Sequence, residues 1–83
     1  DKATWKQWQT ALNKAGHNAG RPDGIPGKMT YAAIQRWAGA KDDGTLGVNT
    51  RRAVQSKLGV KPDGIWGKMT ISELQRRLNK GSI

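Results

Sequence analysis

The chain has 83 residues, of which 15 are Lys or Arg and 6 are Asp or Glu, so its formal net charge is +9. This length suits one small domain with a thin core, and the lack of cysteine excludes both disulfides and a thiolate metal site. No apolar run approaches the roughly 18 residues that a transmembrane helix needs, so no membrane insertion is expected. The excess of cations favours an anionic partner, such as nucleic acid, an acidic membrane surface or an acidic cell-wall polymer.

The opening segment, up to about residue 15, is expected to form an amphipathic helix. Trp5, Trp8 and Leu12 recur at the spacing i, i+3, i+7, which places them on one helical face. We therefore expect Trp5 and Trp8 to lie in the core. Asp1 and Thr4 are alternative N-caps of this helix, and Thr4 begins a capping-box pattern.

One skeleton then occurs three times at intervals of 20 residues. It reads Asp-Gly, two residues, Gly, two residues, Thr, four residues and Gln. Its three copies consist of Asp23, Gly24, Gly27, Thr30 and Gln35; of Asp43, Gly44, Gly47, Thr50 and Gln55; and of Asp63, Gly64, Gly67, Thr70 and Gln75. The opening segment matches the second half of this skeleton with Thr4 and Gln9. A fixed period of this kind is typical of a fold built from repeated units.

Each Asp-Gly pair predicts a tight turn. An Asp side chain accepts hydrogen bonds from backbone N–H groups just ahead of it, and Gly adopts a positive φ without strain. Because Asp recurs at one place in every copy, we interpret Asp23, Asp43 and Asp63 as structural, in preference to ligand-binding carboxylates. A calcium loop would need six or more oxygen ligands, which one Asp per turn does not provide.

A helix is predicted after each turn. The three span about residues 28 or 30 to 37, 48 to 58 and 68 to 79, and they end at Gly39, Gly59 and Lys80-Gly81. The residues expected to point inward are Ile34, Ala38, Ala53, Val54, Leu58, Ile71, Leu74 and Leu78. Thr70 and Glu73 form a second capping-box pattern. The repeated glutamines are expected to bond across helices or to turn carbonyls.

These elements predict one domain over residues 1–83. Strand signals are nearly absent, so the predicted fold class is all-α. We expect a small bundle of about four short helices, joined by Asp-Gly turns and built on the 20-residue repeat. Helices of about ten residues are marginal alone, so each must bury its apolar stripe against the others.

The chain resembles the peptidoglycan-binding domains found beside cell-wall hydrolases, especially in bacteriophage endolysins. Their hallmark is an Asp-Gly-x-aromatic-Gly-x-x-Thr turn, followed by a helix with an Ala-Val or Ala-Ile pair and a Gln. Residues 63–70 match that turn closely with Trp66 as the aromatic, whereas Pro26 and Leu46 stand there in the earlier copies. The resemblance covers nearly the whole chain. The usual domain has three helices and two such turns, whereas four and three are predicted here.

The resemblance implies a non-catalytic module, excised from a larger cell-wall hydrolase, that anchors the catalytic part to the bacterial wall. We expect a monomer that binds peptidoglycan through its glycan, its stem peptide or its interpeptide bridge. Anionic wall polymers are a further expected partner, and no specific nucleic-acid binding is expected. The parent protein is expected to be phage-encoded and released from the host cytoplasm, or secreted.

Aromatic residues are the first candidates for ligand contact, because a ring offers a large contact area with little rotamer freedom to lose. Trp37 is the leading candidate for a ligand-facing aromatic, since the equivalent positions hold small or basic residues (Ala11, Lys57 and Arg77). Tyr31 occupies another mixed position and is expected at a groove edge. Trp66 stands at the family's aromatic position, where a structural role is favoured and a ligand-binding role stays open.

The remaining candidates for ligand contact are basic, namely Arg36, Arg51 and Arg77. Basic residues on a helix often form only a solvated face. Here their excess over acids predicts a positive surface that attracts teichoic acids or other wall anions, and this attraction should be sensitive to salt.

Catalytic chemistry is disfavoured by the residues present. His17 is the single histidine, so neither a zinc triad nor a His-based acyl-transfer site can be assembled. Glu73 is the only Glu, and the adjacent Asp42 and Asp43 are turn residues, so the paired carboxylates of a glycosidase are lacking. We therefore predict a binding domain without a catalytic residue, cofactor or metal.

Two other functions stay open at this point. The positive charge suits a small basic nucleic-acid-binding module, although the sequence has no helix-turn-helix, zinc-finger or aromatic RNA-binding signature. A protein-interaction domain without carbohydrate binding is the third possibility.

Overall fold

The computed structural model describes residues 2–41, 44–81 and 83. It contains four α-helices, α1 (Lys2–Lys14), α2 (Lys28–Ala38), α3 (Val48–Leu58) and α4 (Lys68–Asn79). The described residues include no strand. The predicted all-α bundle is therefore confirmed, and the helix bounds agree with the predicted ones to within one or two residues.

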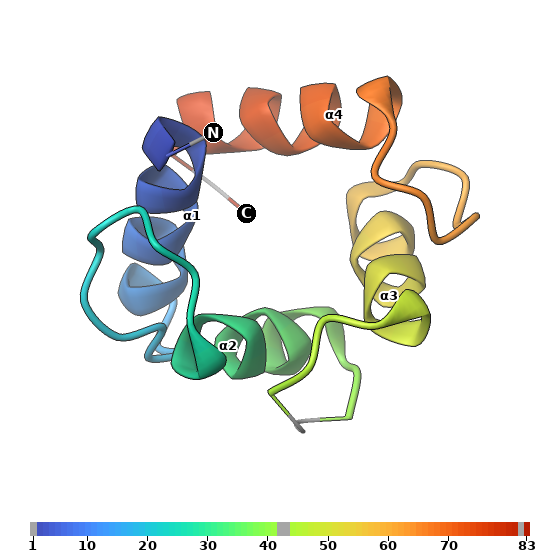
Figure 1. The fold of residues 1–83 in the computed structure, drawn as a ribbon. Helices are drawn as coiled ribbons and strands as arrows, with labels where there is room; N and C mark the ends of the chain where they lie inside the picture. Colours follow the sequence, from blue (N-terminus) through green and yellow to red (C-terminus); the bar gives the residue numbers. More distant parts are fainter. Residues whose placement is uncertain (1, 42–43, 82) are drawn as a thin grey trace.

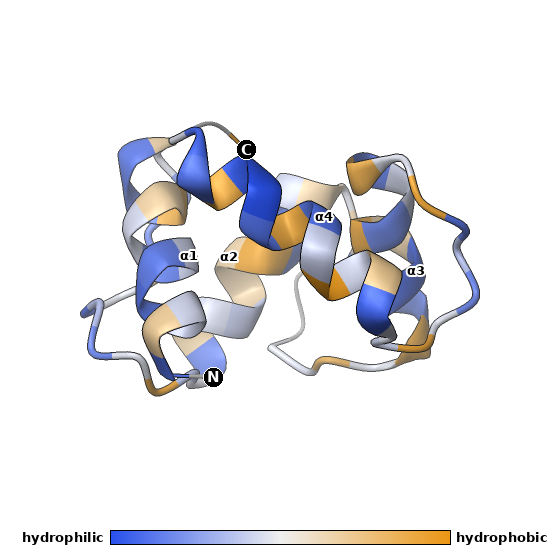
Figure 2. Ribbon diagram, turned by 90° about the horizontal axis from the view of Figure 1, so that it is seen from above, coloured by the Kyte–Doolittle hydropathy of each residue, from blue (hydrophilic) through white to orange (hydrophobic). Residues whose placement is uncertain are grey.

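The helices form the four sides of a ring (Figure 1). Each packs against both of its neighbours, so α1 contacts α2 and α4, and α3 contacts the same two helices. The first and last helices of the sequence thus meet at one corner of the ring. Along every helix hydrophobic residues are interleaved with hydrophilic ones, as an amphipathic pattern requires (Figure 2).

Glycines mark both ends of α2 and α3. Each of these helices begins after an extended Gly, and each ends at a left-handed one, Gly39 (φ 80°) and Gly59 (φ 79°), as predicted. α4 likewise follows an extended Gly67. None of these three starts has a side-chain cap.

The capping-box predictions are therefore wrong. Thr70 lies inside α4 and is buried, and Glu73 pairs with Arg76 at 2.8 Å and Arg77 at 3.2 Å. Thr4 lies inside α1, whereas Asp1, its alternative as a cap, lies outside the described residues. The sequence pattern misled because the Thr side chain of this repeat hydrogen-bonds to a Gln of a neighbouring helix and does not cap its own helix.

The core fills the centre of the ring. Its buried apolar residues are Trp8, Leu12, Ala19, Ala33, Ile34, Trp37, Val54, Leu58, Leu74 and Leu78. Ala38 and Ala53, both predicted to point inward, are half-buried. Ile71 was predicted to be inward as well but is 50% exposed, because it lies at the edge of a surface pocket described below.

A buried glutamine ties each turn to two helices. Gln9 of α1 accepts a hydrogen bond from the backbone N–H of Gly24 at 2.8 Å. Its amide nitrogen donates to the carbonyl of Ile25 at 3.1 Å and to the hydroxyl of Thr30 at 3.0 Å. One side chain thus satisfies a buried N–H and a partly buried carbonyl of the turn, and it also bonds the first turn of α2.

The same three bonds recur in the next two units. Gln35 bonds Gly44, Thr45 and Thr50 at 2.9, 2.8 and 3.0 Å. Gln55 bonds Gly64, Ile65 and Thr70 at 2.8, 2.9 and 3.0 Å. The predicted role of the glutamines is confirmed for these residues. We call this set of bonds the glutamine clamp.

Within the first and third turns, the Asp side chains accept hydrogen bonds from backbone N–H groups. Oδ1 of Asp23 accepts from the N–H of Ile25 at 2.9 Å, and Oδ1 of Asp63 accepts from the N–H of Ile65 at 2.9 Å. The Ile65 N–H and then the Gln55 amide lower the pKa of the Asp63 carboxyl below its ordinary value. Asp43 lies outside the described residues.

Candidate functional site

All five aromatic side chains of the chain form one cluster. Trp8 lies at its centre, stacked on Trp5 with ring centroids 5.6 Å apart and an interplanar angle of 27°. Trp37 and Trp66 meet Trp8 edge-on, with centroid distances of 5.9 and 6.4 Å. Tyr31 meets Trp5 edge-on at 6.2 Å. These rings come from α1, α2 and the third turn, so the ring fold is what brings them together.

A pocket opens beside this cluster. Its volume is about 210 Å³, and it is lined by Thr4, Trp5, Trp8, Trp66, Ile71 and Leu74. We call it the indole pocket. It lies where α4 and the third turn meet α1, and no charged side chain lines it. The pocket therefore suits an uncharged group with apolar faces.

Trp8, one of the residues that line the indole pocket, carries an unusual polar group. Trp8 is 2% exposed, and its indole N–H is buried without a hydrogen-bond partner in the described part of the chain. A buried donor left unpaired costs about 1–3 kcal/mol. Such a group calls for an explanation, and a binding role is one.

Trp37 lies in the core, which corrects the prediction that it faces a ligand. The residue is 6% exposed, and its ring packs edge-on against Trp8. Its indole N–H donates to the carbonyl of Ile83 at 3.5 Å. The mixed residue types at the equivalent positions misled, because Trp37 is the only one of these four residues with a large apolar ring that can pack into the core.

Two of the predicted aromatic residues lie at or near the indole pocket. Trp66 lines it and is half-buried, whereas Tyr31 is half-buried and contacts Trp5 without lining the pocket. Trp5, which is predicted to lie in the core, is half-buried and forms part of the pocket wall. The sequence contained a signal for this placement of Trp5. Trp5 and Ile71 occupy the same position in the repeat as Tyr31, which is predicted at a groove edge.

The three predicted arginines are bound to their own chain away from the indole pocket. Arg36 donates to the carbonyl of His17, and Arg51 donates to the carbonyl of Gly64 at 2.7 Å. Arg77 bonds the Glu73 carboxylate at 3.2 Å and the Leu58 carbonyl at 3.4 Å. Their guanidinium groups are thus occupied in holding loops and helix ends.

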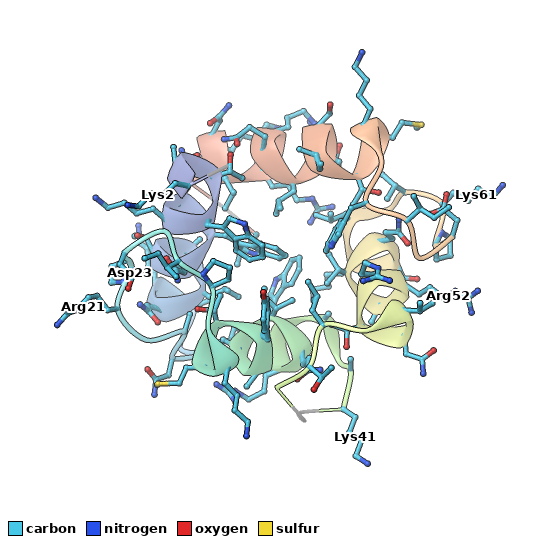
Figure 3. All side chains as sticks on the ribbon, in the orientation of Figure 1. Lys2, Arg21, Asp23, Lys41, Arg52 and Lys61 are labelled. Carbon is cyan, nitrogen blue, oxygen red and sulfur yellow. The ribbon has the colours of Figure 1, made fainter. Side chains whose placement is uncertain are left out.

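Other basic residues project from the outside of the ring. Figure 3 shows Arg21, Lys41, Arg52 and Lys61 pointing away from its centre. We call these four outward-pointing residues the rim cations. They carry part of the net charge of +9, and none of them lines the uncharged indole pocket. The two features can act on different chemical groups of a partner.

A second and larger hollow lies between α1 and the C-terminal end of α4. Its volume is about 490 Å³, and its lining consists of Ala3, Lys6, Gln7, Thr10, Ala11, Lys14, Leu78 and Gly81. It contains no aromatic ring and no buried polar group without a partner. The indole pocket is therefore the stronger candidate.

The described ranges 2–41, 44–81 and 83 hold no group of three or more His, Cys, Asp or Glu placed to bind a metal ion. Nor do they contain a helix whose length and apolar character would let it cross a membrane.

Comparison with known proteins connects this fold to a family. Residues 1–54 match the family model described as "Putative peptidoglycan binding domain". The matched span includes α1, α2, the first two turns and part of α3. Half of the indole-pocket lining (Trp66, Ile71 and Leu74) lies beyond it. The searches of curated proteins and of solved structures returned no significant match. Because the family model covers more than half of its length, the chain belongs to the peptidoglycan-binding domain family, whose members act at the cell wall.

Proposed function

We propose that this chain is a non-catalytic module that anchors an attached peptidoglycan hydrolase, such as an endolysin, to the bacterial wall. The observation that carries the proposal is the indole pocket on a member of a peptidoglycan-binding family. Anchoring raises the local concentration of the attached enzyme at its substrate. Such a parent protein reaches the wall by release from a phage-infected cell or by secretion, and wall binding serves both routes.

The pocket and the rim have separate roles in this proposal. The indole pocket takes a neutral group of peptidoglycan, because aromatic walls contribute contact area and no charge. The rim cations attract teichoic acids and other wall anions over about 10 Å at 0.1 M salt. The rim therefore speeds the approach to the wall, and the pocket provides selectivity.

The carboxylates of the described residues support a role without catalysis. Glu73 is held by Arg76 and Arg77, which lower the pKa of its carboxyl. Asp23 and Asp63 bond their own turns. A glycosidase needs one carboxyl kept protonated near neutral pH, and none of these three is in such an environment.

The direct test is sedimentation of the chain with purified walls. Walls are used with and without teichoic acids, from species with different cross-bridges. We expect binding to stripped walls, reduced by Ile71→Glu, which places a charge at the pocket edge. Met69→Glu is the matched control, since Met69 lies on the same helical turn, is 75% exposed and does not line the pocket. No binding to stripped walls would remove the proposal.

The anchoring part needs its own experiment. The chain is fused to a hydrolase domain that lacks a wall-binding module, and wall lysis is compared with an equimolar mixture of the two. Faster lysis by the fusion at low enzyme concentration supports anchoring. Equal rates would reject anchoring and leave wall binding standing.

A further inference from the structure

We propose that the indole pocket binds the N-acetylated sugars of the glycan strand, and that the Trp8 indole N–H donates a hydrogen bond to the acetamido carbonyl. This inference rests on the proposed wall-binding function and names the ligand of the same site. It commits to the glycan over the stem peptide and the interpeptide bridge.

The Trp8 N–H is an unpaired donor among the described residues. The buried glutamines of α1, α2 and α3 all have partners, whereas the Trp8 N–H has none among the described residues. Because Trp8 lines the pocket, a ligand that supplies one acceptor there would remove this deficit. An acetamido carbonyl is such an acceptor, and it is uncharged.

The walls of the indole pocket are mostly apolar. Three indoles, an Ile and a Leu surround the pocket, with the Thr4 hydroxyl as the single polar side chain of another type. A pyranose ring has an apolar C–H face that packs against an indole. The acetyl methyl group is also apolar, so an N-acetylated sugar presents two apolar surfaces and one acceptor to these walls.

The charges of the peptide parts of the wall weigh against them as ligands of this pocket. Stem peptides carry carboxylates, and bridge peptides before cross-linking carry an amine. No charged side chain lines the pocket, and the candidate arginines Arg36, Arg51 and Arg77 are bonded elsewhere. A charged group buried there would lack a partner, which is strongly unfavourable.

Access to the Trp8 N–H requires a side-chain movement. The N–H itself is covered, and the neighbouring Trp5 and Trp66 are half-buried. Rotamer changes of this size at an interface are common when a ligand binds. The ligand is therefore expected to displace one of these two indoles as it reaches the donor.

The test reads the donor directly. The ¹⁵N-labelled chain has four indole N–H signals, one for each Trp. It is titrated with a β-1,4-linked tetramer of N-acetylglucosamine, with the deacetylated tetramer, with cellotetraose and with a soluble stem peptide. We expect the Trp8 signal to move downfield with the acetylated tetramer alone, while the Trp37 signal, already bonded to Ile83, stays in place.

Paired variants provide a second readout. Trp8→Phe keeps a ring and removes the donor, and we expect it to weaken binding of the acetylated tetramer about 10-fold. Trp37→Phe makes the same change at a neighbouring core ring and should leave the affinity within about twofold. If Trp8→Phe fails to fold, the titration of the unchanged chain still decides.

The outcomes separate this inference from the proposed function. Wall sedimentation with no Trp8 response to the acetylated tetramer overturns the inference and leaves the wall-binding proposal standing. An equal Trp8 response to cellotetraose also overturns it, since the acetamido group is then not what is recognised. Absence of wall binding overturns both.

Discussion

The hydroxyl of Thr4 donates to Oε1 of Gln75 at a distance of 2.7 Å, although the two residues are 71 positions apart. Thr4 and Gln75 occupy the Thr and Gln positions of the repeat. The same pair of positions joins α1 to α2, α2 to α3 and α3 to α4 (Gln9–Thr30, Gln35–Thr50 and Gln55–Thr70). The contact between α4 and α1 therefore closes the ring through the same pair of positions, but here the Thr hydroxyl donates, whereas at the other corners the Gln amide donates to the Thr hydroxyl.

Loss of the closing bond should loosen the corner between α1 and α4. We expect Thr4→Val to lower the free energy of unfolding by about 0.5–1.5 kcal/mol, since it removes one partly buried hydrogen bond and keeps the side-chain shape. Hydrogen exchange should show the loss of protection in these two helices first. Thr10→Val is the control, because Thr10 bonds only within α1 and is exposed, so it should change stability by less than about 0.5 kcal/mol.

The clamp at Gln55 should matter more than the closing bond. Gln55→Leu removes the partner of the buried N–H of Gly64 and of the partly buried carbonyl of Ile65, so we expect a loss of about 2–4 kcal/mol in urea unfolding. Gln75→Leu is the comparison, since Gln75 is only half-buried and follows the last turn, and about 1 kcal/mol is expected. Equal losses would show that the clamp has no special role.

The turn glycines differ in what a methyl group would meet. At Gly24 a Cβ would lie 2.7 Å from the carbonyl oxygen of Lys2, and φ is +82°. At Gly59 φ is +79°, but nothing lies within 4 Å. Gly59→Ala should therefore cost only the left-handed strain, about 1–2 kcal/mol, and Gly24→Ala should cost clearly more. Thermal unfolding of the two variants measures the difference, and similar melting temperatures would contradict it.

Stability should fall in acid partly because of Asp63. Its folded pKa is lowered, chiefly by the Ile65 N–H, so the unfolded chain binds the proton more tightly. The contribution of Asp63 is present above the unfolded pKa of about 3.9 and is lost as pH falls through the folded pKa. Urea unfolding between neutral and acidic pH should show this loss. Asp63→Asn keeps the turn acceptor without the charge and should flatten the acid limb.

The rim charge should affect only walls that carry anions. We expect the double variant Arg52→Gln with Lys61→Gln to bind walls with teichoic acids about threefold more weakly at low salt. Binding to stripped walls should not change. The difference should vanish near 1 M salt, where the Debye length is about 3 Å. A similar loss on stripped walls would place these residues in the peptidoglycan contact.

Much of the fold could be predicted because its rules are local. The Gly after α2 or α3 stops the helix by its own left-handed backbone, and the helix spans follow from spacing. The partners of the glutamines were also foreseeable in kind, since turn groups buried by packing need side-chain bonds. The Thr patterns misled because a capping box and a contact between helices use the same residue types at nearly the same positions.

The site was harder to predict because it depends on closure of the ring. Trp5 and Trp66 lie 61 positions apart, and only the meeting of α1 with α4 makes them two walls of one pocket. The residue types at the positions equivalent to Trp37 predict a ligand-facing side chain, but its burial depends on its contact with Trp8, a ring on another helix. The sequence gives the type of each side chain, but contacts between side chains that are distant in the sequence depend on the tertiary fold.

The indole pocket spans the one corner of the ring that no peptide segment crosses. A sugar bound between Trp5 and Trp66 would contact both sides of this corner and so stabilise the packing of α1 against the third turn and α4. Ligand at about 100 times its dissociation constant would then add about 2.7 kcal/mol to stability by mass action. A wall-bound module would thus have a higher free energy of unfolding than the same module free in solution.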